Sequence, residues 1–210
     1  MKSVLISIQP QWCELIASGK KMIEVRKTRP KIETPFKCYI YCSKGKTFLY
    51  KNPNNGELFL DSNGGYRGGD YEDRFLTGKV IGSFVCDKKY NIFRWGIGVA
   101  VTNEKNEIMP ADILRKGSCL SDDEICDYVG NGEAYGWHIT EPKLFDKPKE
   151  LSEFGKVCNR YENDECDDCP YLQVYVNSYP CDDCVDTWCG VDNIKPLTRP
   201  PQSWCYVEER

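Results

Sequence analysis

Apolar and polar residues alternate over several short stretches of the chain, which is the pattern of β-strands. In the stretch at 22–27, Ile23 and Val25 fall on one face and Glu24 and Arg26 on the other. Two apolar segments, 47–50 and 57–60, flank an Asn-Pro-Asn-Asn-Gly sequence and predict a hairpin. We expect further strands at residues 3–8, 38–42, 79–86, 98–102, 135–140 and 204–208.

Two segments carry helix signals instead. Pro10 at a first-turn position, apolar residues at helical spacing and Gly19 as a terminator predict a short helix near the start. Ser121, with Glu124 three residues later, is a capping box that begins a second short helix. Because no strand–helix–strand rhythm recurs, the sequence predicts a mainly β (α+β) fold, a small β-barrel, and not a parallel α/β fold.

The 210 residues fit one domain with an elaboration. The sequence contains no apolar stretch near the roughly 18 residues that a membrane helix needs. Its first residues carry one basic residue and lead into Gln-Pro-Gln-Trp, which is unlike a signal peptide. We therefore expect a cytoplasmic protein.

Cysteines are concentrated in the last third of the chain. Cys166 with Cys169, and Cys181 with Cys184, form two Cys-x-x-Cys motifs separated by eleven residues, within the range of zinc sites with four thiolate ligands. Such a zinc would be structural, because four protein ligands leave no open position for water. Disulfides or unpaired thiols are the alternative reading.

These features predict a barrel at 1–157, a cysteine-rich insertion at 158–193 and a final barrel strand at 194–210. Cys158 and Cys189 flank the motifs, and the sequence leaves open whether they bind metal, pair or stay free. Residues 158–192 contain nine acidic residues and one basic residue, whereas the rest contains 27 basic and 23 acidic residues. A basic body of this kind suits a polyanionic partner, and the acidic insertion suits a protein partner.

The segment after the first predicted helix groups cations around one carboxylate. A lysine beside other cations in a cleft can act as a base or nucleophile, with Glu24 handling a proton. An ordinary surface ion pair between Glu24 and Arg26 is the alternative. The cations of this segment are Lys20, Lys21, Arg26, Lys27 and Arg29.

The same segment, SIQPQWCELIASGKKMIEVRKTRP at 7–30, resembles the signature of the ASCH family, which is related to the PUA domains of RNA-modifying proteins. The similarity is greatest to ASCH proteins of phages and Gram-positive bacteria, and it spans most of the chain outside the loop near residue 61 and the cysteine-rich insertion. It implies a PUA-like barrel, a cleft beside the first helix and RNA or nucleotide-like ligands. Supporting matches are YIYCSK at 39–44, GKVIG at 78–82, AYGWHI at 134–139 and PPQSWCYV at 200–207.

The resemblance also implies candidate roles. Some ASCH relatives are amidohydrolases that act on acylated cytidine, through a lysine, a threonine and a more distant glutamate, and others are ribonucleases. Lys21 occupies the lysine position, and Glu24 stands where the threonine would be. Glu124 and Glu133 are the candidates for the distant acid.

Three hypotheses follow. The leading one is an RNA- or nucleotide-binding protein whose cleft uses Lys20, Arg26, Ser43 and Lys44. The second is a small hydrolase, an amidohydrolase on a modified nucleoside or a ribonuclease, with Lys21 and Glu24 as catalytic residues. The third is a protein-interaction module that works through the acidic insertion and its zinc.

Overall fold

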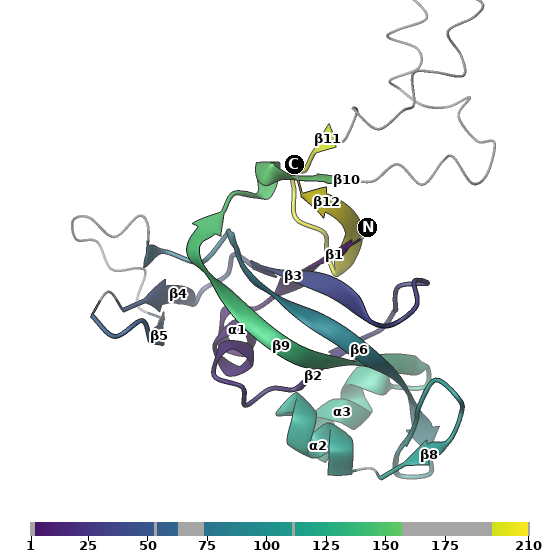
Figure 1. The fold of residues 1–210 in the computed structure, drawn as a ribbon. Coiled ribbons are helices and arrows are strands. Elements are labelled where there is room, and N and C mark those ends of the chain that lie inside the picture. The colour runs from purple at the N-terminus through teal and green to yellow at the C-terminus, as the bar shows by residue number, and fades with distance from the viewer. Residues whose placement is uncertain (1–2, 53, 63–73, 111, 157–194, 210) are drawn as a thin grey trace, which may run out of the picture.

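A computed structural model describes residues 3–52, 54–62, 74–110, 112–156 and 195–209 (Figure 1). Strands dominate these described residues, which also contain three α-helices and a short 3-10 turn. In chain order the elements are β1 (Ser3–Ile8), α1 (Pro10–Ala17), β2 (Ile23–Arg26), β3 (Phe36–Cys42), β4 (Phe48–Lys51), β5 (Leu58–Asp61), β6 (Val80–Trp95), β7 (Gly98–Thr102), β8 (Ile108–Met109), α2 (Asp112–Ser118), α3 (Asp122–Val129), β9 (Glu133–Lys149), η2 (Leu151–Glu153), β10 (Phe154–Lys156), β11 (Lys195–Pro196) and β12 (Trp204–Glu209).

Ten strands form one mixed sheet in the order β11-β10-β12-β1-β3-β6-β7-β8, and β9 pairs with both β6 and β2. β1 runs parallel to β3, and the other pairs are antiparallel. The long strands β6 and β9 cross the middle of the molecule, and α2 and α3 lie at one end of them (Figure 1). The predicted mainly β fold is therefore confirmed, and among the described residues the sheet stays open.

Most of the elements expected from the sequence are present. α1 begins with Pro10 in its first turn, and Gly19 follows it with a φ of 73°. Ser121 caps α3 through both bonds of the capping box. β4 and β5 form the predicted hairpin as a separate two-stranded sheet.

Two differences from the prediction have physical causes. β6 and β9 each run past the expected strands, to 16 and 17 residues, because they pair with each other along both of their halves. α2 was not predicted, since its seven residues are too few to show a helical period. Register shifts in the β6–β9 ladder mark bulges in this long pair.

Three apolar clusters fill the interior. The first lies between α1 and the strands β1, β3 and β6, and it includes Trp137. The second joins Ile23 and Val25 of β2 to the apolar sides of α2 and α3. The third surrounds Phe154 of β10. β2 therefore has an apolar face on the second cluster, which leaves Glu24 and Arg26 on the opposite face as predicted.

β10 and β11 pair with each other, so residues 156 and 195 lie side by side at the edge of the sheet. The predicted insertion at 158–193, with its proposed zinc ligands and with Cys158 and Cys189, lies outside the described residues. Every helix in the described part of the chain is too short or too polar to traverse a membrane.

Candidate functional site

Lys21, Glu24 and Arg26 form a buried charged cluster. The side chains of Lys21 and Glu24 are only 3% and 8% exposed. Lys21 Nζ lies 3.4 Å from Glu24 Oε2, and Arg26 Nη2 lies 3.0 Å from Glu24 Oε1. The ordinary surface ion pair considered from the sequence is thus corrected: Glu24 does pair with Arg26, but inside the protein, because Trp137 of β9 is paired with Glu24 and Trp12 of α1 lies beside Lys21.

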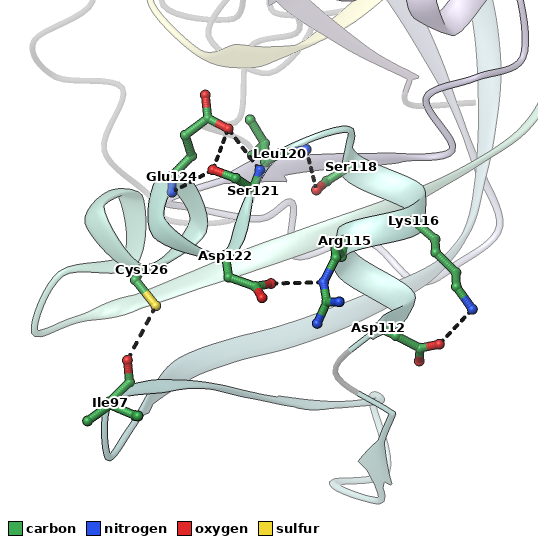
Figure 2. Close-up of polar contacts among 10 residues, drawn as sticks. All are labelled: Ile97, Asp112, Arg115, Lys116, Ser118, Leu120, Ser121, Asp122, Glu124 and Cys126. Carbon is green, nitrogen blue, oxygen red and sulfur yellow. Dashed lines mark hydrogen bonds and ion pairs between the residues drawn. The ribbon is translucent and has the colours of Figure 1, made fainter.

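The C-terminal end of α2 helps to hold Lys21. Lys21 Nζ donates a hydrogen bond of 2.6 Å to the carbonyl oxygen of Ser118 and lies 4.8 Å from the ring centre of Trp12. Gly117 lets α2 approach β2 closely, since a Cβ there would lie 2.7 Å from Ile23 Cδ1. Figure 2 shows Ser118 at the end of α2, where its hydroxyl accepts a hydrogen bond from the Leu120 N–H.

The cluster leaves several buried polar atoms without hydrogen bonds. Within the described part of the chain, Glu24 Oε2, Arg26 Nε and Trp137 Nε1 have no hydrogen-bond partner. Glu24 Oε2 is within ion-pair distance of Lys21 Nζ but lacks hydrogen-bond geometry, so the two observations agree. Glu24 pairs with Trp137 across β2 and β9, which puts both side chains on one face. Unsatisfied buried groups concentrated in one place are typical of a functional site.

Cys13 of α1 is a buried residue close to this cluster. Burial raises the pKa of the Cys13 thiol well above its usual range, and hydrogen bonding and charge from Cys42, together with the charge of Glu24, raise it further. The thiol is therefore neutral at physiological pH and serves as a packing group, not as a nucleophile.

A pocket of about 420 Å³ lies next to the cluster, and we call it the Ser7 pocket. Its polar groups are hydroxyls, one amide and the ammonium group of Lys44, and the described residues that line it include no carboxylate. Burial raises the pKa of Tyr41, so its phenol keeps its proton. The lining residues are Ser7, Tyr41, Ser43, Lys44, Gly78, Leu151, Thr198, Pro200, Pro201 and Gln202.

Ser7 connects the pocket to the buried charged cluster. Arg26 Nη2 donates a hydrogen bond to the backbone oxygen of Ser7. The hydroxyl of Ser7 donates in turn to the carbonyl oxygen of Pro201, at 2.6 Å. Arg26 therefore holds Ser7, one of the lining residues of the pocket, through the Ser7 backbone.

Gly78 gives Lys44 its place in the pocket. Gly78 has a φ of 86°, a left-handed conformation that favours glycine. A Cβ at this position would lie 2.8 Å from Cε of Lys44 and 3.4 Å from its Cγ. The Lys44 side chain thus packs against the Gly78 backbone, in space that a Cβ atom would occupy.

The residues proposed from the sequence fall into separate places. Ser43 and Lys44 line the pocket, and Arg26 supports it through Ser7. Lys20 is exposed and is not among the lining residues. Glu124 is engaged in the capping box of α3, and Glu133 accepts a hydrogen bond from the Tyr135 hydroxyl at 3.0 Å. Neither of these two carboxylates is a described contact of Lys21.

The sequence reading did not single out Ser7, Gly78 or the loop at 200–202 as site residues. A signal was nevertheless present, because four of the five segments that resemble ASCH proteins supply lining residues of the pocket. The fifth segment, at 134–139, contains Trp137, which is paired with Glu24 of the buried charged cluster. Motif segments far apart in the sequence therefore converge on one region.

No family model matches the sequence, and no curated protein matches it either. Among solved structures, the chain is similar to ASCH from Zymomonas mobilis, with a TM-score of 0.44 and 16% identity over 71% of this chain and 73% of that one. A tyrosine-to-phenylalanine mutant of that protein gives a TM-score of 0.43 and 15% identity over 72% and 77% of the two chains. A serine-to-alanine mutant gives 0.46 and 14% over 98% and 88%. All three carry the name of the family that the sequence motifs resemble.

Proposed function

We propose that this protein binds RNA or a nucleotide in the Ser7 pocket. The observation that carries the proposal is the lining of the pocket, which combines several hydroxyl donors with the Lys44 ammonium group and contains no carboxylate among the described residues. Phosphate groups are recognised by such donors and cations. A volume of about 420 Å³ is within the usual range of small-ligand sites and suits a nucleotide.

In this proposal the residues have different roles. Lys44 and Ser43 contact the phosphate, and the amide of Gln202 is available to the sugar or base. Arg26 is a positioning residue that holds Ser7. The basic charge of the chain outside residues 158–192 favours a polyanion as ligand.

The test is titration of the purified protein with uridine monophosphate and with a short single-stranded RNA at several salt concentrations. Lys44→Glu should weaken the binding of both ligands by about tenfold or more, because it replaces a charge-assisted hydrogen bond by repulsion. Lys105→Glu, in the exposed turn between β7 and β8, makes the same charge change away from the pocket and should leave mononucleotide affinity unchanged. Equal affinities in the two variants would refute the proposal.

A second candidate function is hydrolysis of a modified nucleoside. It is favoured by Lys21 Nζ lying 3.4 Å from a carboxylate oxygen of Glu24 that has no hydrogen bond. Turnover of an acylated cytidine that is lost in Lys21→Ala would support it. Lys89→Ala is the matched control, since Lys89 is also buried, ion-paired and bonded to a backbone carbonyl. Loss of turnover in both variants would point to unfolding.

Three expectations stay predictions, and two of them concern residues outside the described part of the chain. The structural zinc on Cys166, Cys169, Cys181 and Cys184 stays a prediction, to be checked by measuring the zinc content of the purified protein. Docking of a protein partner by the acidic insertion stays a prediction as well, as does the cytoplasmic location.

A further inference from the structure

A row of paired residues runs from the buried charged cluster across five strands to the edge of the sheet. Directly paired residues on neighbouring strands place their side chains on the same face. One face of the sheet therefore continues from β2 through β9, β6 and β7 to β8. The row pairs Arg26 with Tyr135, Tyr135 with Asn91, Asn91 with Thr102 and Thr102 with Ile108.

Polar groups on this row are tied to one another. The guanidinium group of Arg29 lies 4.8 Å from the ring centre of Tyr135 and donates a hydrogen bond of 2.9 Å to Asn91 Oδ1. Asn91 Nδ2 donates to the hydroxyl of Thr102 at 3.3 Å. Arg29 itself is exposed, so a cation is held over an aromatic ring at the surface.

The next positions along β6 on the same face are aromatic. Phe93 pairs with Ala100 and Glu133, and Trp95 pairs with Gly98. Their partners on β7 are small, and Phe93 is half-buried whereas Trp95 is 72% exposed. We call Tyr135, Phe93 and Trp95, together with Arg29, the aromatic face.

A contact with α3 holds the hairpin that carries Trp95. The thiol of Cys126 lies 3.8 Å from the carbonyl oxygen of Ile97 in the turn between β6 and β7 (Figure 2). Trp95 lies two residues beyond the last residue of β6 that pairs with β9, and its end of the strand is supported by pairing with β7 and by this contact. An exposed aromatic side chain on a supported strand is suited to binding.

We propose that the aromatic face binds the single-stranded RNA that flanks the nucleotide in the Ser7 pocket. This inference rests on the proposed function. Aromatic rings on an open sheet stack on unpaired bases of any sequence, and an arginine adds a cation to the stack. Arg26 links the aromatic face to the pocket, because it belongs to the row of paired residues and its guanidinium group also bonds the backbone oxygen of Ser7.

The charges on the face agree with an RNA strand in one orientation. Arg29 is the cation beside Tyr135, so the phosphates pass on its side. Glu133 lies on the same face beside Phe93, where its carboxylate can accept a hydrogen bond from an N–H group of a base. Bases therefore lie toward β6 and the backbone toward the loop that carries Arg29.

The experiment compares uridine monophosphate with a single-stranded oligouridine of about eight nucleotides. Trp95→Ala should weaken binding of the oligonucleotide by roughly tenfold, which corresponds to the loss of one stacked base, and leave mononucleotide affinity unchanged. Trp95→Phe keeps a ring and should retain most of the affinity. Ile97→Ala removes an apolar side chain that is 98% exposed and lies in the turn, outside the paired rows, and it is the matched control.

The outcomes separate this inference from the proposed function. If the wild type binds the mononucleotide and the oligonucleotide equally well, or if Trp95→Ala binds the oligonucleotide like the wild type, the aromatic face is not an RNA site although the pocket is. If neither ligand binds the wild type, the proposed function itself fails. If sedimentation shows a dimer that Trp95→Ala abolishes, the face is an interface between two copies of the chain and the inference is overturned.

Discussion

The buried charged cluster and the Ser7 pocket are neighbours that differ in burial. The cluster holds its cations and its carboxylate almost out of contact with water, whereas Lys44 of the pocket is exposed. Breaking a buried ion pair leaves its partner charged and desolvated, while an exposed lysine contributes little to stability. The comparison indicates that the cluster stabilises the end of β2 and holds the pocket wall, and that the pocket is the part free to bind.

The largest effect is expected for Glu24→Ala. This change leaves both Lys21 and Arg26 buried without their carboxylate, so the free energy of unfolding should fall by about 3–5 kcal/mol. Urea denaturation followed by circular dichroism measures it. Lys44→Ala is the comparison from the pocket and should change the same quantity by less than about 0.5 kcal/mol. Similar losses in the two variants would contradict the distinction between the regions.

An intermediate effect is expected for Arg26→Lys, which tests the link between the two regions. Lysine keeps a positive charge near Glu24 but cannot span from that carboxylate to the backbone oxygen of Ser7 as the guanidinium does. The free energy of unfolding should fall by about 1–2 kcal/mol, and nucleotide affinity should fall as well because the wall at Ser7 loosens. Unchanged affinity with reduced stability would show that Arg26 does not support the pocket.

The smallest effect on stability is expected for Gly78→Ala. Both Gly78 and Gly56 have a positive φ, of 86° and 74°, so alanine at either position should lower the free energy of unfolding by about 1 kcal/mol. A Cβ would lie 2.8 Å from Cε of Lys44 at position 78, but 3.9 Å from Cε of Lys51 at position 56. Only Gly78→Ala should therefore weaken nucleotide binding, as isothermal titration calorimetry can measure. Equal binding by both variants would rule out the proposed role of Lys44.

Local patterns predicted much of the fold. Pro10 and Gly19 mark α1, and the capping box at Ser121 marks α3, because helix ends depend on side chains a few residues apart. The alternation of side chains along a strand is also a local property, and it correctly placed Ile23 and Val25 on the face opposite Glu24 and Arg26. The full lengths of β6 and β9 could not be predicted in this way, since they are set by pairing between distant segments.

The candidate site was predicted in part. Lys21, Glu24 and Arg26 were recognised because they are close along the chain, and Ser43 and Lys44 because of the motif segment at 39–44. The sequence did not show that the first three are buried or that the last two line a separate pocket. Burial depends on which elements cover a strand face, and that is a property of the whole fold.

By itself, the sequence determined the mainly β character, the positions of helices α1 and α3, the two faces of β2 and the basic charge outside the cysteine-rich segment. Only the tertiary structure decided that Arg26 meets Ser7, that Gly78 lies under Lys44 and that one sheet face joins Arg26 to the aromatic side chains of β6. The reason is physical: periodicity and capping act between neighbours in the chain, whereas a pocket is made by strands and loops that meet only when the sheet has formed.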